Sequence, residues 1–249
     1  MGIKIDYRIT AVRSREEYAL ELARMIGEPE SSIMWDEERR GSVWNKNRTC
    51  RDFLENSDAT HLLLLDDDAV TVNNFKEIVE MAVSRFPDAI WSFFDNSHEY
   101  KHRPKHTPYL ELFNKNVRGI CLVMPRQFVQ PFLDFWDREI APKYPKWNHD
   151  DTGKKMFALL NDIRVMGTIP SLVYARQIRS AMPTHHNITE NTSCWRGRDI
   201  DVAQFNTYDY EVDKIRSLFM THLDMNEPIC RKCAAKFKRN KLLEKVQKG

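Results

Sequence analysis

Long apolar runs are missing from this sequence of 249 residues. No window approaches the roughly 18 consecutive apolar residues that identify a membrane-spanning helix. The first residues, Met-Gly-Ile-Lys-Ile-Asp, lack the apolar stretch of a signal peptide. The five cysteines are odd in number and scattered, which fits reduced thiols better than a disulfide framework. We therefore expect a cytoplasmic protein that does not bind a membrane.

Glycine-rich nucleotide-binding signatures are also missing, because the chain contains neither a Walker A sequence nor Gly-x-Gly-x-x-Gly. Internal repeats and low-complexity tracts are absent as well. What the chain does have is an apolar fraction of 42% and a charged fraction of 30%, as in soluble globular proteins. Its length suffices for one large domain. We expect that domain over residues 1–220, followed by a basic helical tail over residues 221–249.

The charge of the chain is unevenly distributed. Residues 231–249 contain eight Lys or Arg and one Glu, a net charge of +7, so the remaining residues sum to −5 within the total of +2. A basic tail on an acidic body favours contact with nucleic acid or another polyanion. The alternative is a solvated, soluble C-terminal helix.

An apolar strand followed by three acids is the most informative local pattern. Residues 60–68 read Thr-His-Leu-Leu-Leu-Leu-Asp-Asp-Asp, and a short apolar run with polar ends is typical of a buried strand. Alternate residues of an extended segment point the same way, so Asp66 and Asp68 would converge while Asp67 turns aside. Two such oxygen donors suit Mg²⁺ or Mn²⁺, with a diphosphate as the remaining ligand. Alternatively, the three acids only cap the next helix.

Strand-like and helix-like segments alternate along the chain. A β-rich stretch over 3–12 precedes a helical pattern over 15–26, and the leucine strand precedes another helical pattern over 73–86. A further strand is expected over 117–124. This alternation favours an α/β fold with a mostly parallel central sheet and helices on both faces.

A second acidic cluster, Trp-Asn-His-Asp-Asp-Thr, covers residues 147–152 where a turn enters a helix. Asp150 or Asp151 could cap that helix. The functional interpretation is that one carboxylate acts as a general base, which must reach the proton that it removes. That role requires a fold that brings Asp151 next to Asp68.

Six motifs occur in a recognisable order: Thr-Ala-Val-Arg at 10–13, Gly-x-x-Trp-Asn-x-x-Arg at 41–48, the leucine–aspartate segment, Arg-Gly-Ile-Cys-Leu-Val-Met-Pro-Arg at 118–126, His-Asp-Asp-Thr at 149–152, and Ile-Pro-Ser-Leu-Val at 169–173. Together they resemble the GT-A glycosyltransferases that tailed phages and some bacteria encode. The resemblance runs from about residue 8 to residue 180.

This resemblance implies a GT-A-like fold and a nucleoside-diphosphate sugar donor, a UDP-sugar foremost, held by the N-terminal half. It places Thr10, Arg13 and Asp36 near the nucleoside. Asn45 or Arg48 could reach the donor.

In the Asp-x-Asp motif the resemblance implies that Asp66 contacts the ribose or the metal and Asp68 binds the metal that bridges the diphosphate. Asp67 would belong to the same donor site. Asp151, or its neighbour Asp150, would deprotonate the acceptor hydroxyl in an inverting transfer. A metal on the diphosphate stabilises the charge that develops on the leaving group.

The sequence departs from the family pattern after Pro-Ser-Leu-Val. Similar enzymes carry a metal-binding histidine there, whereas this chain continues Tyr-Ala-Arg. Arg176 could neutralise the diphosphate instead, or His185 or His186 could supply the imidazole.

The expected function is therefore a metal-dependent glycosyltransferase, and the favoured acceptor is a hydroxymethylated pyrimidine in phage DNA. A saccharide or lipid acceptor is the first alternative. A metal-dependent nuclease and a non-catalytic nucleic-acid-binding protein are the others. Cys230 and Cys233 could form half of a zinc site, although two reduced thiols are the commoner explanation for such a pair.

Overall fold

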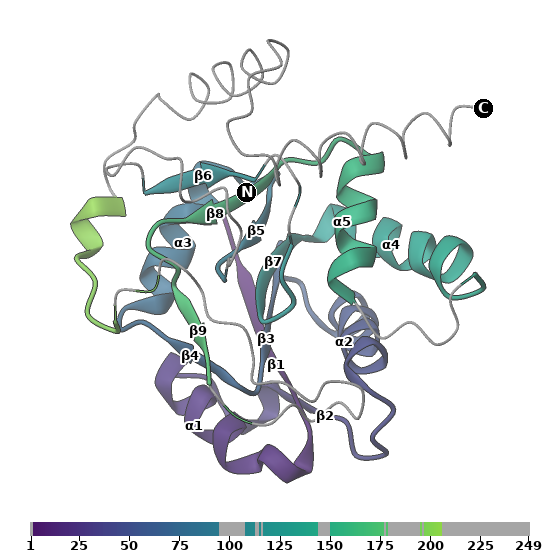
Figure 1. The fold of residues 1–249 in the computed structure, drawn as a ribbon, viewed down its shortest axis with the longest axis horizontal. Helices are drawn as coiled ribbons and strands as arrows, with labels where there is room; N and C mark the ends of the chain where they lie inside the picture. Colours follow the sequence, from purple (N-terminus) through teal and green to yellow (C-terminus); the bar gives the residue numbers. More distant parts are fainter. Residues whose placement is uncertain are drawn as a thin grey trace.

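A computed structural model describes residues 2–94, 108–112, 115, 117–143, 150–176, 178, 195 and 197–205. Strands and helices alternate over most of this part of the chain (Figure 1). Its elements are β1 (Ile5–Ala11), η1 (Arg13–Arg15), α1 (Glu16–Ile26), η2 (Glu30–Ser32), β2 (Ile33–Trp35), α2 (Ser42–Asn56), β3 (His61–Asp66), β4 (Ala69–Thr71), α3 (Phe75–Arg85), β5 (Ile90–Ser92), β6 (Tyr109–Glu111), β7 (Cys121–Pro125), α4 (Arg126–Phe135), η4 (Trp136–Ile140), α5 (Asp150–Leu160), β8 (Val165–Thr168), β9 (Val173–Ala175) and η5 (Val202–Phe205).

A seven-stranded sheet in the order β2-β1-β3-β7-β5-β8-β6 forms the centre of the fold. β1 pairs in parallel with β2 and β3, and β5 pairs in parallel with β8. β7 lies antiparallel between β3 and β5, and β6 is antiparallel to β8. Most of the strands therefore run the same way, and the predicted mostly parallel α/β sheet is confirmed.

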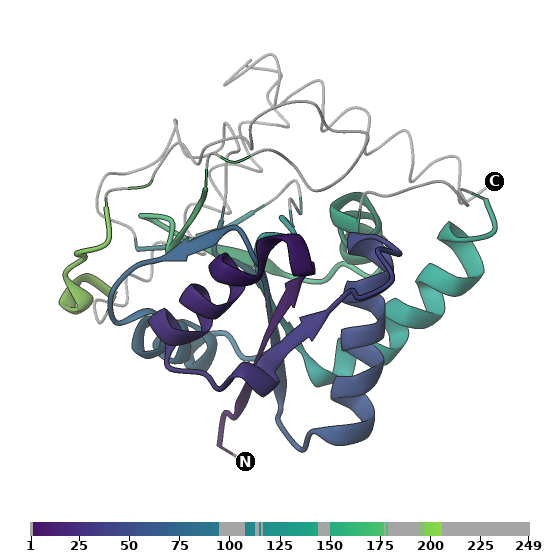
Figure 2. The ribbon, with the colours of Figure 1, turned by 90° about the horizontal axis from the view of Figure 1, so that it is seen from below.

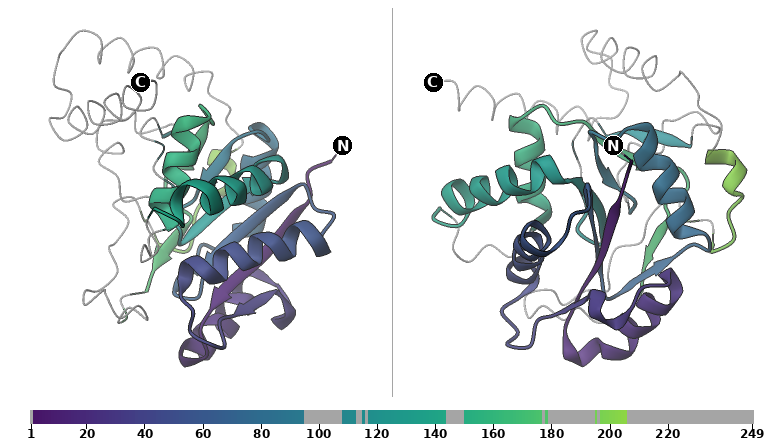
Figure 3. Two further views of the ribbon diagram at one scale, coloured as in Figure 1. Left: turned by 90° about the vertical axis from the view of Figure 1, so that its right-hand side faces the viewer. Right: turned by 180° about the vertical axis from the view of Figure 1, so that it is seen from behind.

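The continuous apolar run of β3 exists because this strand is buried on both faces. Leu63 and Leu65 pack into one core with residues of α1 and α3, whereas Leu62 and Leu64 pack into a second core with residues of α2, α4 and α5. Figures 1 and 3 show these two sets of helices on opposite sides of the sheet. Fully burying a leucine contributes roughly 1.5–3 kcal/mol, so β3 anchors both layers.

The helix boundaries follow from local chemistry. α1 buries Ala19, Leu22, Ala23 and Ile26 along one face and ends at Gly27, whose φ of 67° is left-handed. Glycine adopts that conformation without steric penalty. Figure 2 shows α1 and α2 on either side of β1 and β2. The predicted helix over 15–26 matches α1 within one residue.

Some elements differ from their predicted extent. The strand expected over 117–124 begins only at Cys121, because residues 119 and 120 form a turn. β4 and β9 form a separate antiparallel pair in which Ala69 lies opposite Ala175. A strand of three residues shows no readable alternation, which is why the sequence did not reveal this pair.

Some predicted features lie outside the described residues. These are His185 and His186, Cys230 and Cys233, and the tail over 221–249. In the part of the chain that is described, no helix combines the length and apolar character needed to cross a membrane.

Candidate functional site

The carboxyl ends of β1 and β3 lie side by side and define the position of the site. The register pairs Thr10 with Asp66. The Thr10 hydroxyl donates a hydrogen bond to Asp66 Oδ1 at 2.9 Å. Ligands of open α/β sheets bind beyond such strand ends. Asp66 is thereby oriented at the edge where a ligand would be held.

Asp67 connects the acidic turn, residues 66–68, to the segment after β1. Its carboxylate accepts the backbone N–H of Val12 at 3.2 Å and a hydrogen bond from Arg15 Nη1 at 2.9 Å. Burial raises the pKa of Asp67, and the Arg15 guanidinium opposes that effect. The contacts of Asp67 are therefore those of a residue that holds two loops together.

Asp68 is buried but less completely paired than its neighbours. Arg15 Nη1 lies 3.4 Å from Oδ2, whereas the buried Oδ1 has no hydrogen-bond partner among the described residues. Burial, together with the charges of Asp66 and Asp67, raises the pKa of Asp68 to about 7. An uncompensated buried carboxylate oxygen is costly. It is the kind of atom that a bound cation would satisfy.

Lys46 of α2 is the central contact of the site. Its Nζ lies 2.9 Å from Asp66 Oδ1, 3.2 Å from Asp150 Oδ2 and 3.1 Å from the carbonyl oxygen of Gly119. Only 3% of its side chain is exposed. Burial lowers the pKa of this ammonium, but the Asp150 and Asp66 carboxylates outweigh burial and raise it above its ordinary value. Lys46 therefore stays charged and connects β3 to the start of α5.

Asp150 opens α5 and lies between two lysines. Lys154, one turn along the helix, donates to Asp150 Oδ2, which Lys46 approaches from α2. Burial alone would raise the pKa of Asp150, yet the two ammonium groups reverse the sign and lower it. A carboxylate held this way is a weak base, and its contacts fix the position of the helix.

Asp151 differs from Asp150 in the exposure of its side chain and in the direction in which its pKa is shifted. Its side chain is 36% exposed, and Arg118 Nη1 lies 3.9 Å from its Oδ2. Desolvation by the surrounding cluster and the negative charge of Asp150 raise the pKa of Asp151 to about 7. A carboxylate that is accessible and titrates near neutral pH suits a general base.

Gly119 allows the acidic groups to approach one another. A Cβ atom at this position would lie 2.6 Å from Asp151 Oδ1, 2.6 Å from Lys46 Nζ and 2.9 Å from Asp150 Oδ2. Real Cβ atoms do not approach other atoms that closely, so a side chain here would displace the cluster. Steric crowding therefore explains why the motif at 118–126 has a glycine at this position.

A divalent metal is implied by the family resemblance, and two aspartates of the site fit that expectation. Asp68 Oδ1 is a buried oxygen without a hydrogen-bond partner among the described residues, and Asp66 lies at the adjoining strand end. Within the described ranges, no group of three or more His, Cys, Asp or Glu side chains is arranged for a metal ion. The donor diphosphate would therefore have to supply the other ligands.

Three residues expected near the nucleoside or donor already have protein partners. Asp36 accepts the backbone N–H groups of Arg40 and Gly41 at 2.9 and 2.7 Å and so shapes the loop before α2. Asn45 donates to the Met34 carbonyl oxygen at 2.7 Å. Arg48 donates to Asn45 Oδ1 at 2.8 Å. These contacts place all three beside the end of β2.

Arg13 and Arg176, the two other arginines predicted near the donor, lie in different parts of the fold. Arg13 is half exposed, pairs with Glu37 at 2.7 Å and stacks on the Trp35 ring at 4.1 Å from its centroid. The backbone N–H of Arg176 donates to the Asp68 carbonyl oxygen at 2.8 Å, whereas its side chain reaches Glu21 at 2.8 Å. The end of β9 therefore lies against the acidic turn, and the Arg176 guanidinium points to α1.

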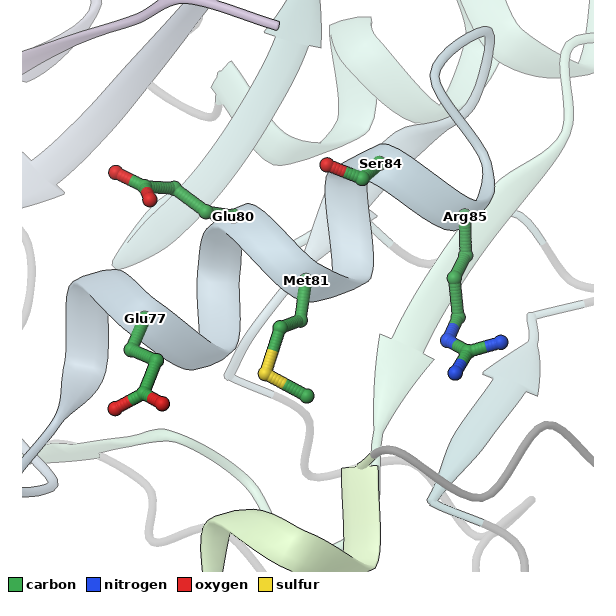
Figure 4. A pocket seen from close by; sticks show the side chains of 5 residues that line it. All are labelled: Glu77, Glu80, Met81, Ser84 and Arg85. Atoms are coloured by element: carbon green, nitrogen blue, oxygen red, sulfur yellow. The ribbon is translucent and has the colours of Figure 1, made fainter.

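An open hollow of about 460 Å³ lies on the outer face of α3. Figure 4 shows Glu77, Met81 and Arg85 along one side of that helix, with η5 close by. The hollow shares no residue with the acidic cluster. Its lining of mixed charges at helical spacing is that of a solvated helix face, so it is separate from the site at the ends of β1 and β3.

Four residues that contact the acids, Lys46, Arg15, Gly119 and Lys154, were given no role from the sequence. A signal was present for the lysines, because Lys46 shares a helix face with the buried Cys50 and Phe53, and Lys154 shares one with Phe157. Lysine is almost never buried unless it is paired. A lysine within an apolar helical stripe therefore predicts a buried carboxylate partner, although it does not identify that partner.

Comparison with known proteins adds a likeness of fold. No protein-family model matches the sequence, and no curated protein shows significant similarity to it. Among solved structures, A197 from STIV is 13% identical with a TM-score of 0.45, covering 68% of this chain and 83% of its own. The galactosyltransferase LgtC, in complex with donor and acceptor sugar analogues, is 9% identical with a TM-score of 0.43, covering 84% and 99%. The inositol-1-phosphate CTP transferase from T. maritima is 8% identical with a TM-score of 0.36, covering 66% of each chain. At these values the neighbours carry no conclusion about what this chain does.

Proposed function

We propose that this protein is a glycosyltransferase that moves a sugar from a nucleoside-diphosphate sugar to a hydroxyl acceptor. One observation carries the proposal. Asp66 and Asp150 are 84 positions apart in sequence, yet both contact the Nζ atom of Lys46. The acids that would hold the donor therefore lie in one cluster with the acids that would activate the acceptor, which is the arrangement that the reaction requires.

Asp151 is the group that we assign as the general base. Asp150 is held by two ammonium groups that lower its pKa, whereas Asp151 is partly exposed and has a pKa raised to about 7. In an inverting transfer, the acceptor oxygen forms a bond to the anomeric carbon while the bond to the diphosphate breaks. The carboxylate of Asp151 takes the proton of the acceptor hydroxyl as that bond forms.

Asp66 and Asp68 are the residues that would hold Mn²⁺ or Mg²⁺ on the donor side. The buried Oδ1 of Asp68 supports this assignment, because it lacks a hydrogen-bond partner in the described part of the chain. When bound, such an ion would neutralise the charge that develops on the leaving diphosphate. Thr10 fixes the orientation of Asp66 through the hydrogen bond at 2.9 Å.

A hydroxymethylated pyrimidine in DNA is the acceptor that we favour. The net charge of +7 over residues 231–249 supports it, since Lys and Arg provide the phosphate contacts that dominate binding to DNA. A saccharide or lipid acceptor is the alternative and requires no basic tail.

A metal-dependent nuclease is the competing enzyme, and the partners of the acids argue against it. Two-metal cleavage needs several carboxylate oxygens directed at the two ions. Here Lys46 contacts Asp66 and Asp150, and Arg15 contacts Asp67 and Asp68. These cations already neutralise the carboxylates, and among these four acids only Asp68 Oδ1 is buried without a hydrogen-bond partner in the described part of the chain, which suits one ion better than two.

The test is to incubate the protein with a panel of nucleotide sugars, with and without Mn²⁺, and to measure release of the nucleoside diphosphate. We expect slow hydrolysis of one donor and faster release when the acceptor is added. DNA containing hydroxymethylcytosine should gain one sugar mass per modified base, whereas plain DNA should not react because it lacks the hydroxyl. Cleavage of plain plasmid without donor turnover would overturn the proposal.

A further inference from the structure

Lys46 is a residue of the proposed site to which neither the sequence motifs nor the resemblance gives a role. Its ammonium contacts an acid of β3, an acid of α5 and the carbonyl oxygen of the turn before β7. Three separate parts of the fold therefore converge on one buried atom. Through that atom the end of β3 is connected directly to the first turn of α5.

We propose that Lys46 is the positioning residue that sets the separation between the donor half and the acceptor half of the site. This inference rests on the proposed glycosyltransferase function. Asp66 belongs to the donor half. Asp150 fixes the first turn of α5, from which the neighbouring Asp151 projects.

The geometry explains why one lysine can have this effect. The position of Asp151 relative to β3 depends on how the start of α5 is held against the sheet. Lys46 connects these elements through contacts of 2.9 and 3.2 Å, and its ammonium cannot shift toward the turn because it already contacts the Gly119 carbonyl oxygen at 3.1 Å. A misplacement of about 1 Å between reacting groups lowers rates by about 10²-fold.

Donor binding should be less sensitive to Lys46 than turnover. Without Lys46, Asp66 still accepts the hydrogen bond from Thr10, and Asp150 still pairs with Lys154. Each carboxylate therefore keeps one partner, and what disappears is the connection between them. A positioning role thus predicts a large fall in kcat with a small change in donor affinity.

Lys154 provides a matched control. It is also buried, it also binds Asp150, and it lies on the same helix as that acid, so its pairing with Asp150 makes no connection to β3. Lys46→Met and Lys154→Met each remove one buried ammonium and leave Asp150 with one lysine. Lys46→Met should lose at least as much stability as Lys154→Met, because Lys46 also contacts Asp66 and the Gly119 carbonyl oxygen, and thermal unfolding measures both losses.

The experiment compares the two variants with the wild type for transfer kcat and for binding of the free nucleoside diphosphate. We expect Lys46→Met to lower kcat by about 10²-fold while the dissociation constant changes less than about threefold. Lys154→Met should stay within about tenfold of wild-type kcat. Equal losses of kcat in both variants, or a loss of nucleotide binding as large as the loss of kcat, would overturn the positioning role. If the wild type turns over no nucleotide sugar, the proposed function fails, and the role of Lys46 fails with it.

Discussion

Replacing Asp151 with asparagine tests the assignment of the base most directly. Asparagine keeps the shape of the side chain but cannot take a proton. A positioned general base contributes about 10² to 10⁴ in rate, so we expect kcat for transfer to fall by that factor. Binding of the donor nucleotide should be unchanged, since Asp151 acts on the acceptor proton.

The pH dependence gives this experiment a second readout. With a pKa of about 7, Asp151 is ionised in about a tenth of the molecules at pH 6 and in most of them at pH 8. Wild-type kcat should therefore rise roughly tenfold between pH 5 and pH 6 and level off only above about pH 8. The Asp151→Asn variant should lose the part of that rise that Asp151 causes and keep at most the part that comes from Asp68, whose pKa is also raised to about 7.

Stability should not fall in this variant, and the sign follows from linkage. The folded-state pKa of Asp151 is raised above its ordinary value of 3.8, so this residue favours the folded state least once pH exceeds about 7. Removing the charge should leave the variant at least as stable as wild type at pH 8. Asp162→Asn, an exposed residue just beyond the same helix, is the matched control and should change neither property. Transfer by Asp151→Asn within a few-fold of wild type at pH 8 would refute the assignment.

Four further outcomes are expected. Gly119→Ala should lower kcat at least tenfold with a modest loss of stability, because its Cβ meets the ends of side chains and not the backbone, whereas Gly2→Ala, which has open space around it, should be neutral in both assays. Asp150→Asn should destabilise the fold by about 3–5 kcal/mol in denaturant titrations, because it leaves Lys154 buried without its carboxylate partner and Lys46 with Asp66 alone; unchanged stability would contradict the buried ion cluster. Asp68→Asn should abolish transfer while the unfolding midpoint changes little, and near-wild-type transfer would exclude Asp68 as a metal ligand. Removing residues 236–249 should weaken binding to DNA and reduce its salt dependence by about 0.9 for each phosphate that the tail neutralises, while hydrolysis of the free donor continues, and an unchanged salt slope would exclude the tail from DNA binding.

The sequence by itself determined the elements whose signals are local. The leucine run predicted a buried strand that ends in acids, and β3 is that strand, with Leu62 and Leu63 in different cores. The amphipathic patterns predicted α1 and α3 to within about two residues at each end. These elements can be predicted from the sequence because the period of the hydrophobic residues and the capping residues involve positions only a few residues apart.

Only the tertiary structure decided which distant residues meet. The antiparallel placement of β7 between β3 and β5 brings Gly119 to the acids, and α5 brings Asp150 to Lys46. The tertiary structure also distinguishes two adjacent aspartates, because Asp150 lies between two ammonium groups whereas Asp151 remains accessible. The contacts of Lys46 with Asp66 and Asp150 span 20 and 104 positions, and such contacts leave no periodic pattern in the sequence. They arise from the pairing order of the strands and from the requirement that every buried charge have a partner.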